Sequence, residues 1–188
     1  RKAGYKPAII SRGYRGKASS WPQQVRPDSD PVVVGDEAVL LARRCDCPIA
    51  VGTDRSASVE ALLQHTDCNL IISDDGLQHY ALERDVEIAV VDAMRRFGNG
   101  CLLPAGPLRE PVKRLDEVDC VVSNGIAARG EYAMSMRMQK ACNLVTGESC
   151  ELQTFVDEPV HAVAGIGNPK RFFSALLQQG LTFHEHAF

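Results

Sequence analysis

Short apolar runs rich in β-branched residues alternate with helix-forming segments through the first half of the chain. The expected strands are residues 7–10, 31–34, 48–51 and 69–73, and the expected helices are 38–44 and 55–64. Strands that alternate with helices form parallel sheets, whose strands are joined by right-handed crossovers. The pattern therefore predicts an α/β fold with a mostly parallel sheet and leaves residues 19–30 as a polar loop.

The run at residues 69–73 stops at two adjacent acids, Asp74 and Asp75, and then Gly76. In open α/β sheets, ligands bind at the carboxyl ends of the strands. Acidic groups in that position can hold Mg²⁺ and the phosphates that it bridges. Asp and Gly also dominate ordinary turns for local reasons. On the residues alone, a metal or phosphate site and a simple turn both remain open.

The loop after the first expected strand combines cations with glycines. It runs Ser-Arg-Gly-Tyr-Arg-Gly-Lys and contains Arg12 and Arg15. It fails as a P-loop, because that motif needs four residues between its glycines and a Ser or Thr after the Lys. The loop suits an anionic ligand, and a solvated basic turn is the alternative.

A second acidic pair, Asp36 and Glu37, stands at the start of the helix expected at residues 38–44. Asp36 occupies the position expected for an N-cap, and Glu37 falls in the first turn, where acids suit the helix dipole. The functional alternative is a carboxylate at the mouth of a site, acting as general base or metal ligand.

The alternation continues and then weakens in the second half. Strands are expected at residues 85–91 and 120–123, with a short helix at 112–118. The long loop at 93–111 contains Arg109 and is too apolar for disorder, so we expect it to be functional. Short alternating segments at 131–138, 142–146 and 151–155 indicate antiparallel strands. We therefore expect a domain of residues 1–124 and a smaller α/β lobe of residues 125–188, with strands at 161–164 and 181–188 around a helix at 170–179.

Composition excludes few functions. The chain has 188 residues and a net charge of −3, so bulk charge gives no reason to expect a nucleic-acid partner. No apolar run reaches the roughly 18 residues needed to span a membrane. The seven cysteines form no Cys-x-x-Cys motif, and we expect them to be reduced.

Gly165-Ile166-Gly167 partly imitates a dinucleotide fingerprint, so a NAD-type oxidoreductase is a rival function. His184 and His186 share a strand face and form a weak metal candidate.

An ordered set of motifs is more specific than any single one. In order, its members are Ser11-Arg12-Gly13-Tyr14, Gly35-Asp36-Glu37, Asp74-Asp75-Gly76-Leu77-Gln78-His79, Gly98-Asn99-Gly100, residues 102–111 and Ala164-Gly165-Ile166-Gly167-Asn168-Pro169. Together these motifs closely resemble the tetraacyldisaccharide 4′-kinases, the lipid A 4′-kinases of Gram-negative bacteria, over nearly the whole chain.

The resemblance implies a P-loop kinase-like core, with helices on both faces of a mostly parallel sheet, and a smaller C-terminal lobe. It implies ATP- and Mg²⁺-dependent phosphorylation of the 4′-hydroxyl of a tetraacylated glucosamine disaccharide 1-phosphate. The expected partners are this acylated lipid and the cytoplasmic face of the bacterial inner membrane.

Particular residues match the family's functional positions. Asp36 matches the proposed catalytic base, and Glu37 matches the neighbouring acid near the metal. Asp74 and Asp75 match Walker B-like acids, and Gln78 and His79 complete that nucleotide-binding motif. The basic residues Arg12, Arg15 and Arg109 are expected to receive phosphate.

The sequence also departs from the family pattern. The Gly-rich phosphate loop and the hydrophobic anchor are expected upstream of Arg1, and a His-containing motif is expected after Phe188. We therefore expect residues 1–188 alone to be inactive. A non-catalytic α/β remnant, in which the acids serve only as caps and turns, is a further alternative.

Overall fold

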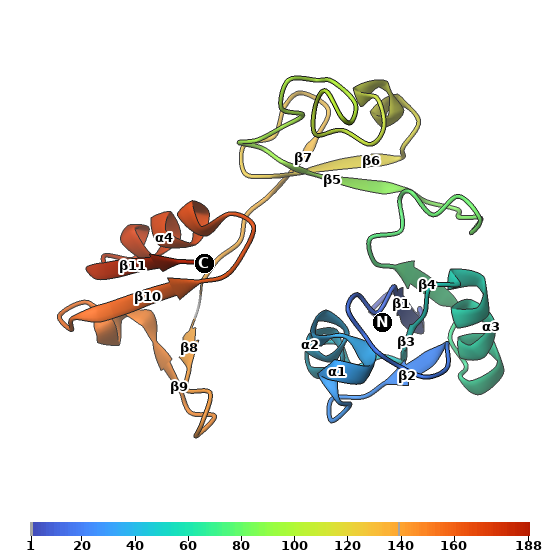
Figure 1. The fold of residues 1–188 in the computed structure, drawn as a ribbon, viewed down its shortest axis with the longest axis horizontal. Helices are drawn as coiled ribbons and strands as arrows, with labels where there is room; N and C mark the ends of the chain where they lie inside the picture. The colour runs from blue at the N-terminus through green and yellow to red at the C-terminus, as the bar shows by residue number, and fades with distance from the viewer. Residues whose placement is uncertain (1, 139) are drawn as a thin grey trace. The chain divides into compact units, whose positions relative to one another are not determined.

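The chain divides into two compact units. The structure is a computed structural model that describes residues 2–138 and 140–188 (Figure 1). The first unit comprises residues 1–123 and 127–132, and the second comprises 124–126 and 133–188. The chain thus passes from one unit to the other between residues 123 and 133.

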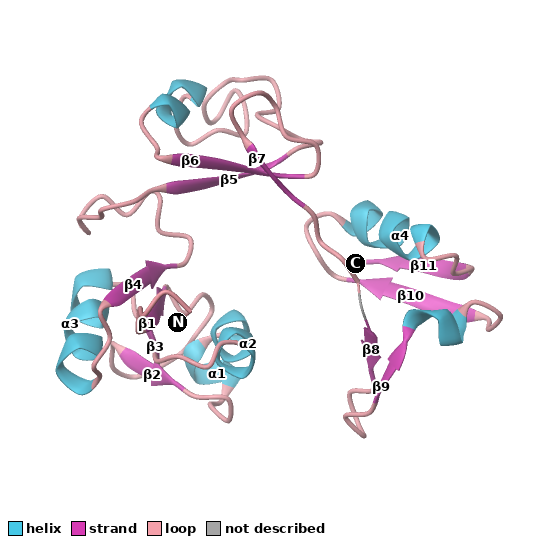
Figure 2. Cartoon of the chain, turned by 180° about the vertical axis from the view of Figure 1, so that it is seen from behind, coloured by secondary structure: helices cyan, strands magenta, loops and turns pink. Residues whose placement is uncertain are grey.

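A four-stranded sheet organises the first part of unit 1 (Figure 2). Its order is β2-β3-β1-β4, and the strands are β2 (Gln23–Val25), β3 (Ile49–Val51), β1 (Pro7–Ser11) and β4 (Leu70–Ser73). Both β3 and β4 pair with β1 in parallel, whereas β2 pairs with β3 antiparallel. The parallel arrangement predicted from the alternating pattern is confirmed.

Both faces of this sheet are covered by helices. On one face, Ile9 and Val51 join a buried cluster with Val39 of α2 (Asp36–Arg44). On the other face, Ile10 is buried with Leu62 of α3 (Arg55–His65). Successive residues of β1 thus enter opposite cores, which is the period of a strand buried on both sides.

Residues 31–34 were expected to form a strand, and that expectation is wrong. They form the short helix α1 (Pro31–Val34), which Asp30 caps by accepting a hydrogen bond of 2.8 Å from the backbone N–H of Val32. Pro31 stands in the first turn, where its fixed φ suits a helix and its missing N–H is not needed. The cap and the proline outweigh the β-propensity of three consecutive valines.

The polar loop expected at residues 19–30 contains a strand, β2, that the sequence did not reveal. Its three residues, Gln-Gln-Val, show almost no hydrophobic alternation, and only Val25 is buried. The strand forms because it pairs with the edge of β3, with Gln24 opposite Ala50. Tertiary pairing of this kind leaves no local signal in the sequence.

The rest of unit 1 contains strands β5 (Ile88–Asp92) and β6 (Cys120–Asn124), which belong to a three-stranded sheet of order β5-β6-β7. Strand β7 (Tyr132–Met134) spans the point where the chain passes from unit 1 to unit 2. The helix expected at residues 112–118 is the shorter 3₁₀-helix η1 (Val112–Asp116). The loop at 93–111 contains one isolated bridge, between Leu102 and Leu108.

Unit 2 contains two separate two-stranded sheets. Strands β8 (Lys140–Cys142) and β9 (Ser149–Glu151) are antiparallel, whereas β10 (Val160–Ala164) and β11 (Phe183–Ala187) are parallel, with α4 (Pro169–Gln178) between them in sequence. Residues 152–155, expected to be strand, form the 3₁₀-helix η2 (Leu152–Phe155), whose Leu152 joins the core of α4 and β10.

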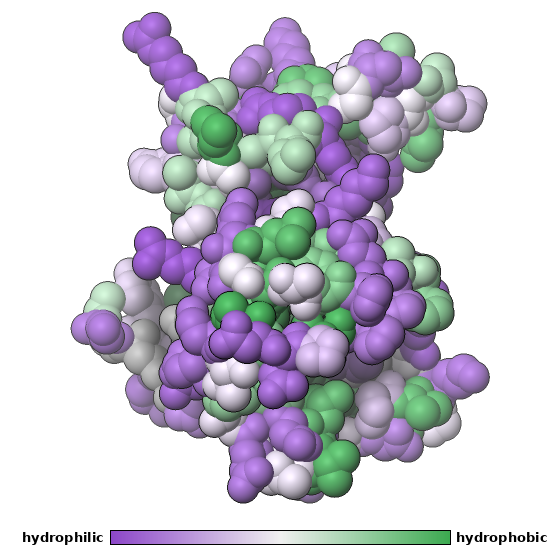
Figure 3. All heavy atoms as spheres, turned by 90° about the vertical axis from the view of Figure 1, so that its left-hand side faces the viewer, coloured by the Kyte–Doolittle hydropathy of each residue, from purple (hydrophilic) through white to green (hydrophobic). Residues whose placement is uncertain are grey.

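The surface of the chain is mixed in character. In the space-filling view, hydrophilic residues predominate, and smaller groups of apolar residues lie between them (Figure 3). All seven cysteines are free. Among the described residues, no helix has the length and apolar character needed to cross a bilayer.

The packing of α3 generates a first prediction. Leu62→Ala should lower the free energy of unfolding by about 2–5 kcal/mol, because it leaves a cavity against β1. Leu63→Ala on the same helix should change it by less than about 1 kcal/mol, because Leu63 is 55% exposed whereas Leu62 is 4% exposed. Urea denaturation of both variants measures the difference. Equal losses would show that α3 does not pack through Leu62.

A carboxylate that accepts four hydrogen bonds links the loop after β5 to the end of β6. Glu131 accepts hydrogen bonds from both terminal nitrogens of Arg96, at 2.7 and 2.9 Å, and from the backbone N–H of Ala128 at 2.9 Å. The buried hydroxyl of Ser123 donates a further bond of 2.5 Å. These bonds, led by the one from Arg96, lower the pKa of Glu131 to about 2.

The low pKa of Glu131 predicts how stability depends on pH. Because the carboxylate is favoured in the folded state, its contribution is present above the ordinary pKa near 4.5 and is lost as the pH falls towards 2. Glu131→Gln should therefore be less stable than the unmodified chain at pH 6, and the difference should shrink between pH 4.5 and 2. Denaturation curves across that range test this, and a constant difference would contradict it.

Candidate active site

Three parallel strands end together at one edge of the four-stranded sheet. The backbone N–H of Gly52, just after β3, donates to the carbonyl of Ser11 at 3.1 Å, and that of Asp74, just after β4, donates to Ile10 at 2.9 Å. The hydroxyl of Ser11 then donates to Oδ2 of Asp74 at 3.1 Å. The candidate site is therefore at the carboxyl edge, where ligands bind in open α/β sheets.

The turn after β4 has an unusual and sterically restricted backbone conformation. Asp75 has a φ of 48°, in the left-handed region that non-glycine residues seldom adopt. A Cβ added to Gly76 would lie 2.2 Å from Oγ of Ser73, so only glycine fits at this position. Oγ of Ser73 is itself buried without a hydrogen-bond partner. Residues 73–76 thus form a tightly constrained turn that presents Asp75 to solvent.

Arg55 also belongs to this edge, although it was not among the residues expected from the sequence. It is the first residue of α3 and only 3% exposed, and its Nη2 donates to the carbonyl oxygen of Asp74 at 2.9 Å. Burial lowers the pKa of Arg55, and the negative charges of Asp74 and Asp75 oppose that shift. The available signal was a cation directly after the helix-capping Asp54, where the chain leaves a strand end.

Asp36 and Glu37 lie in the first turn of α2, and both are exposed. The expectation that Asp36 caps the helix is wrong. Gly35 occupies the cap position with a φ of 93°, and Asp36 is already helical, its Oδ1 accepting from the backbone N–H of Glu37 at 3.1 Å. Asp36 therefore does not act as the N-cap, and the bond that its side chain accepts at the helix start is the one from its neighbour Glu37.

The start of α2 lies against the cationic loop that follows β1. A Cβ on Gly35 would come within 2.7 Å of the carbonyl oxygen of Tyr14, so the backbones are in close contact. Because α2 leads into the amino end of β3, its own amino end lies at the carboxyl edge of the sheet. The structure thus brings Asp36 and Glu37 to the same edge as Asp74 and Asp75.

The basic residues of the loop are exposed. The guanidinium of Arg15 lies 5.4 Å from the centre of the Tyr14 ring, and the residue has a φ of 60°. The charge of Arg12 contributes to lowering the pKa of Arg55, which places Arg12 in the electrostatic environment of the site. Both cations are free to meet an anionic ligand from solvent.

Gln78 and His79 follow the acidic turn and lead to a second network. Nε2 of Gln78 donates to Glu110 at 2.9 Å, and the hydroxyl of Tyr80 donates to the same carboxylate. These bonds, led by that from Tyr80, lower the pKa of Glu110. Nη1 of Arg84 donates to the backbone carbonyl of His79 at 3.3 Å. The turn is thereby tied to the end of the 93–111 loop, where Arg109 is exposed beside Glu110.

The donors at this edge fit a hard divalent cation. Within the described part of the chain, no three His, Cys, Asp or Glu side chains are grouped closely enough to form a complete metal cage. Mg²⁺ does not require such a cage, because it is typically held by one or two carboxylates together with waters and phosphate oxygens. Asp74 and the exposed Asp75 match that requirement.

The structure adds no support for the two alternative sites suggested by the sequence, the glycine motif at residues 165–167 and the histidines near residue 186. A Cβ on Gly165 or Gly167 would meet no atom of the described residues within 4 Å, so no packing within this part of the chain requires glycine at either position. Nδ1 of His161 and Nε2 of His186 lie 2.8 Å apart on the exposed face of β10 and β11, within hydrogen-bond distance of each other.

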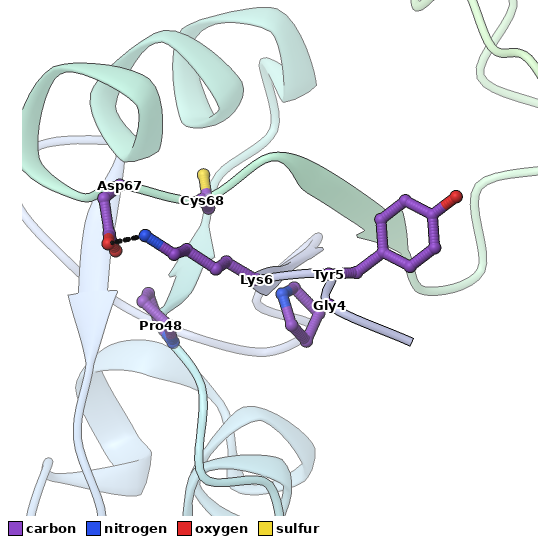
Figure 4. Close-up of a pocket in the computed structure, with 7 residues that line it drawn as sticks. Gly4, Tyr5, Lys6, Pro48, Asp67 and Cys68 are labelled. Carbon is purple, nitrogen blue, oxygen red and sulfur yellow. Dashed lines mark hydrogen bonds and ion pairs between the residues drawn. The ribbon is translucent and has the colours of Figure 1, made fainter. Parts of the chain in front are cut away.

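A hollow of about 390 Å³ lies at the opposite edge of the sheet (Figure 4). It is lined where β1, β3 and β4 begin, and it contains an ion pair of 2.5 Å between Lys6 and Asp67. Its position at the amino ends of the strands separates it from the carboxylates described above.

Comparisons with known proteins agree on one family. The family model described as tetraacyldisaccharide-1-P 4′-kinase (LpxK) matches residues 1–188. The chain is 58% identical over 188 residues to the tetraacyldisaccharide 4′-kinase of Nitrosococcus oceani, covering all of this chain and 56% of the relative. It is 52% identical to that of Methylobacillus flagellatus, covering all of this chain and 57% of the relative. The chain thus spans somewhat more than half of these curated relatives.

A solved structure shares the fold. It is described as a crystal structure of the "apo" form of LpxK from Aquifex aeolicus in complex with ATP. It matches with a TM-score of 0.76 and 26% identity, covering all of this chain and 62% of the other. The expected P-loop kinase-like α/β fold is therefore confirmed, and the chain belongs to the tetraacyldisaccharide-1-P 4′-kinase family.

Proposed function

We propose that the protein containing this chain transfers the γ-phosphoryl group of ATP to the 4′-hydroxyl of a tetraacylated glucosamine disaccharide 1-phosphate. Family membership over the whole chain carries this proposal. The gathering of Asp36, Asp74 and Arg55 at one sheet edge supports it, because phosphoryl transfer depends mainly on positioning and on neutralising charge. Binding of ATP by the Aquifex aeolicus relative supports the choice of nucleotide.

The acidic residues have separate roles in this proposal. Asp36 accepts the proton of the sugar hydroxyl as it attacks, because a carboxylate within reach makes a poor nucleophile effective. Asp74 and Asp75, with Glu37 nearby, hold Mg²⁺, which when bound neutralises phosphate charge. Gln78 and His79 contact the nucleotide.

The basic residues receive phosphate groups. Arg12 and Arg15 project from the loop beside α2, and Arg109 projects from the apolar 93–111 loop, where phosphate and acyl chains can meet. Arginine suits this task because its planar guanidinium binds phosphate through two parallel hydrogen bonds. The acylated substrate further leads us to propose that the enzyme works at the cytoplasmic face of the inner membrane.

The direct test is an assay with ATP, Mg²⁺ and the acylated disaccharide 1-phosphate in the full-length protein that contains this chain. The expected product is the 4′-phosphate, identified by mass spectrometry. A parallel titration with NADH, followed by the fluorescence of NADH, tests the alternative function as a NAD-type oxidoreductase. Tight NADH binding without phosphoryl transfer would contradict the proposed kinase function.

Asp36→Ala should lower kcat by about 10²–10⁴, with a much smaller effect on the KM for ATP, because the base acts in the transition state. Steady-state kinetics with varied ATP measure both constants. Asp28→Ala is the matched control, since Asp28 is an exposed acid in a turn outside the site. A near-normal kcat in Asp36→Ala would show that another group accepts the proton.

Asp75→Asn should raise the Mg²⁺ concentration that gives half-maximal activity by about tenfold or more. Asn tolerates the left-handed backbone of residue 75, so the turn should survive while a charged metal ligand is lost. Activity measured against Mg²⁺ concentration, together with the melting temperature, separates the two effects. A lower melting temperature with unchanged Mg²⁺ dependence would mean that the acid serves only the turn.

A further inference from the structure

Arg55 is a buried cation at this edge that has been given no role of its own above. Its side chain is 3% exposed at the start of α3, and Nη2 donates to the carbonyl of Asp74 at 2.9 Å. The other terminal nitrogen, Nη1, is buried and has no hydrogen-bond partner among the described residues. An unpaired buried donor of this kind is destabilising, because it has lost its hydrogen bonds to water without replacement.

Packing alone does not account for an arginine at this position. Apolar residues of similar volume usually replace buried charged groups with little loss, and often with a gain, of stability. Leu62, on the same helix, already anchors α3 to the sheet through Ile10 and Ala8. Packing of α3 therefore does not explain a charge at residue 55.

The surroundings of Arg55 explain that charge. Asp74 and Asp75 are adjacent in sequence, and both interact electrostatically with the guanidinium. A positive charge beside them offsets the repulsion between two neighbouring carboxylates. The bond to the Asp74 carbonyl also fixes the peptide between them, at the point where Asp75 takes its left-handed conformation.

Asp74 is consequently held from two directions. Ser11 of β1 donates to its carboxylate at 3.1 Å, and Arg55 of α3 donates to its backbone carbonyl at 2.9 Å. Because Arg55 bonds to the backbone and leaves the carboxylate oxygens to other partners, these oxygens remain available at the edge of the sheet. Outer contacts of this kind typically change metal affinity by about 10–100-fold when they are removed.

We propose that Arg55 is a positioning residue that holds the Asp74–Asp75 pair in the geometry for a divalent cation. It acts through the backbone of Asp74 and through its charge, without contacting the cation. The inference rests on the proposed function insofar as the cation belongs to a kinase, and its test includes measurements that do not require activity.

The experiment uses two substitutions in the full-length protein. Arg55→Met fills the same volume without charge or donor, and Arg55→Lys keeps the charge with a single donor group. Mn²⁺, a paramagnetic substitute for Mg²⁺, is titrated and its free concentration is followed by electron paramagnetic resonance. We expect Arg55→Met to raise the Kd for Mn²⁺ by about tenfold or more, and Arg55→Lys to recover part of that loss.

A second readout reports on the turn itself. Amide hydrogen exchange in a peptide covering residues 73–79 should become at least severalfold faster in Arg55→Met, without a comparable change in α2. Leu62→Ala is the control, because it should loosen α3 and lower the melting temperature while leaving the Kd for Mn²⁺ unchanged. Arg55→Met should retain a melting temperature close to that of the unmodified protein.

Three outcomes would overturn the inference. They are an unchanged Kd for Mn²⁺ in Arg55→Met, a rise in that Kd as large in Leu62→Ala as in Arg55→Met, and no Mn²⁺ binding by the unmodified protein. Failure of the proposed function would look different, because the unmodified protein would then bind Mn²⁺ but form no 4′-phosphate. The two failures are therefore distinguishable.

Discussion

The parallel backbone pairing of β3, β1 and β4 is the constraint on which the candidate site depends. Its hydrogen bonds continue past the strands, from Gly52 to Ser11 and from Asp74 to Ile10, so the three chain segments leave the sheet at one level. Residues far apart in sequence are thereby brought to one edge. The α2 helix then adds Asp36 to the same edge, because a right-handed crossover returns each helix to the amino end of the next strand.

Local strain and burial are concentrated where these segments meet. Asp75 has a left-handed backbone, Gly76 admits no side chain, and Arg55 is buried with one unpaired donor. Each feature alone is destabilising, and each is retained next to the carboxylates proposed to hold Mg²⁺. Strained backbone and costly buried polar groups commonly persist at functional sites, where the surrounding structure keeps them in place. The same sheet edge therefore combines the residues proposed for phosphoryl transfer with strained and buried polar groups of the kind that functional sites contain.

Particular elements show how far the sequence could be interpreted. The apolar runs that become β1, β3 and β4 were predictable from the sequence. Strands β1 and β3 are buried on both faces, as continuous apolar runs indicate, whereas Leu70 and Ile72 of β4 are exposed. The cap at Asp54 was also predictable, and its Oδ1 accepts from the backbone N–H of Ala57 at 3.0 Å. By contrast, the valines of α1 favour a strand, and a helix forms there instead because Asp30 caps it and Pro31 stands in its first turn. The Asp36 cap was wrong because Gly35, with its positive φ, takes that position.

The sequence by itself determined the family, the alternating α/β pattern and the acidic candidates Asp36, Asp74 and Asp75, because ordered motifs and strand-end acids are local features of the chain. Only the tertiary structure decided that β2 pairs with β3 and that Arg55 supports the turn after β4. Strand pairing and the burial of a guanidinium depend on segments separated by many residues. No local pattern records such contacts, so they become visible only once the chain has folded.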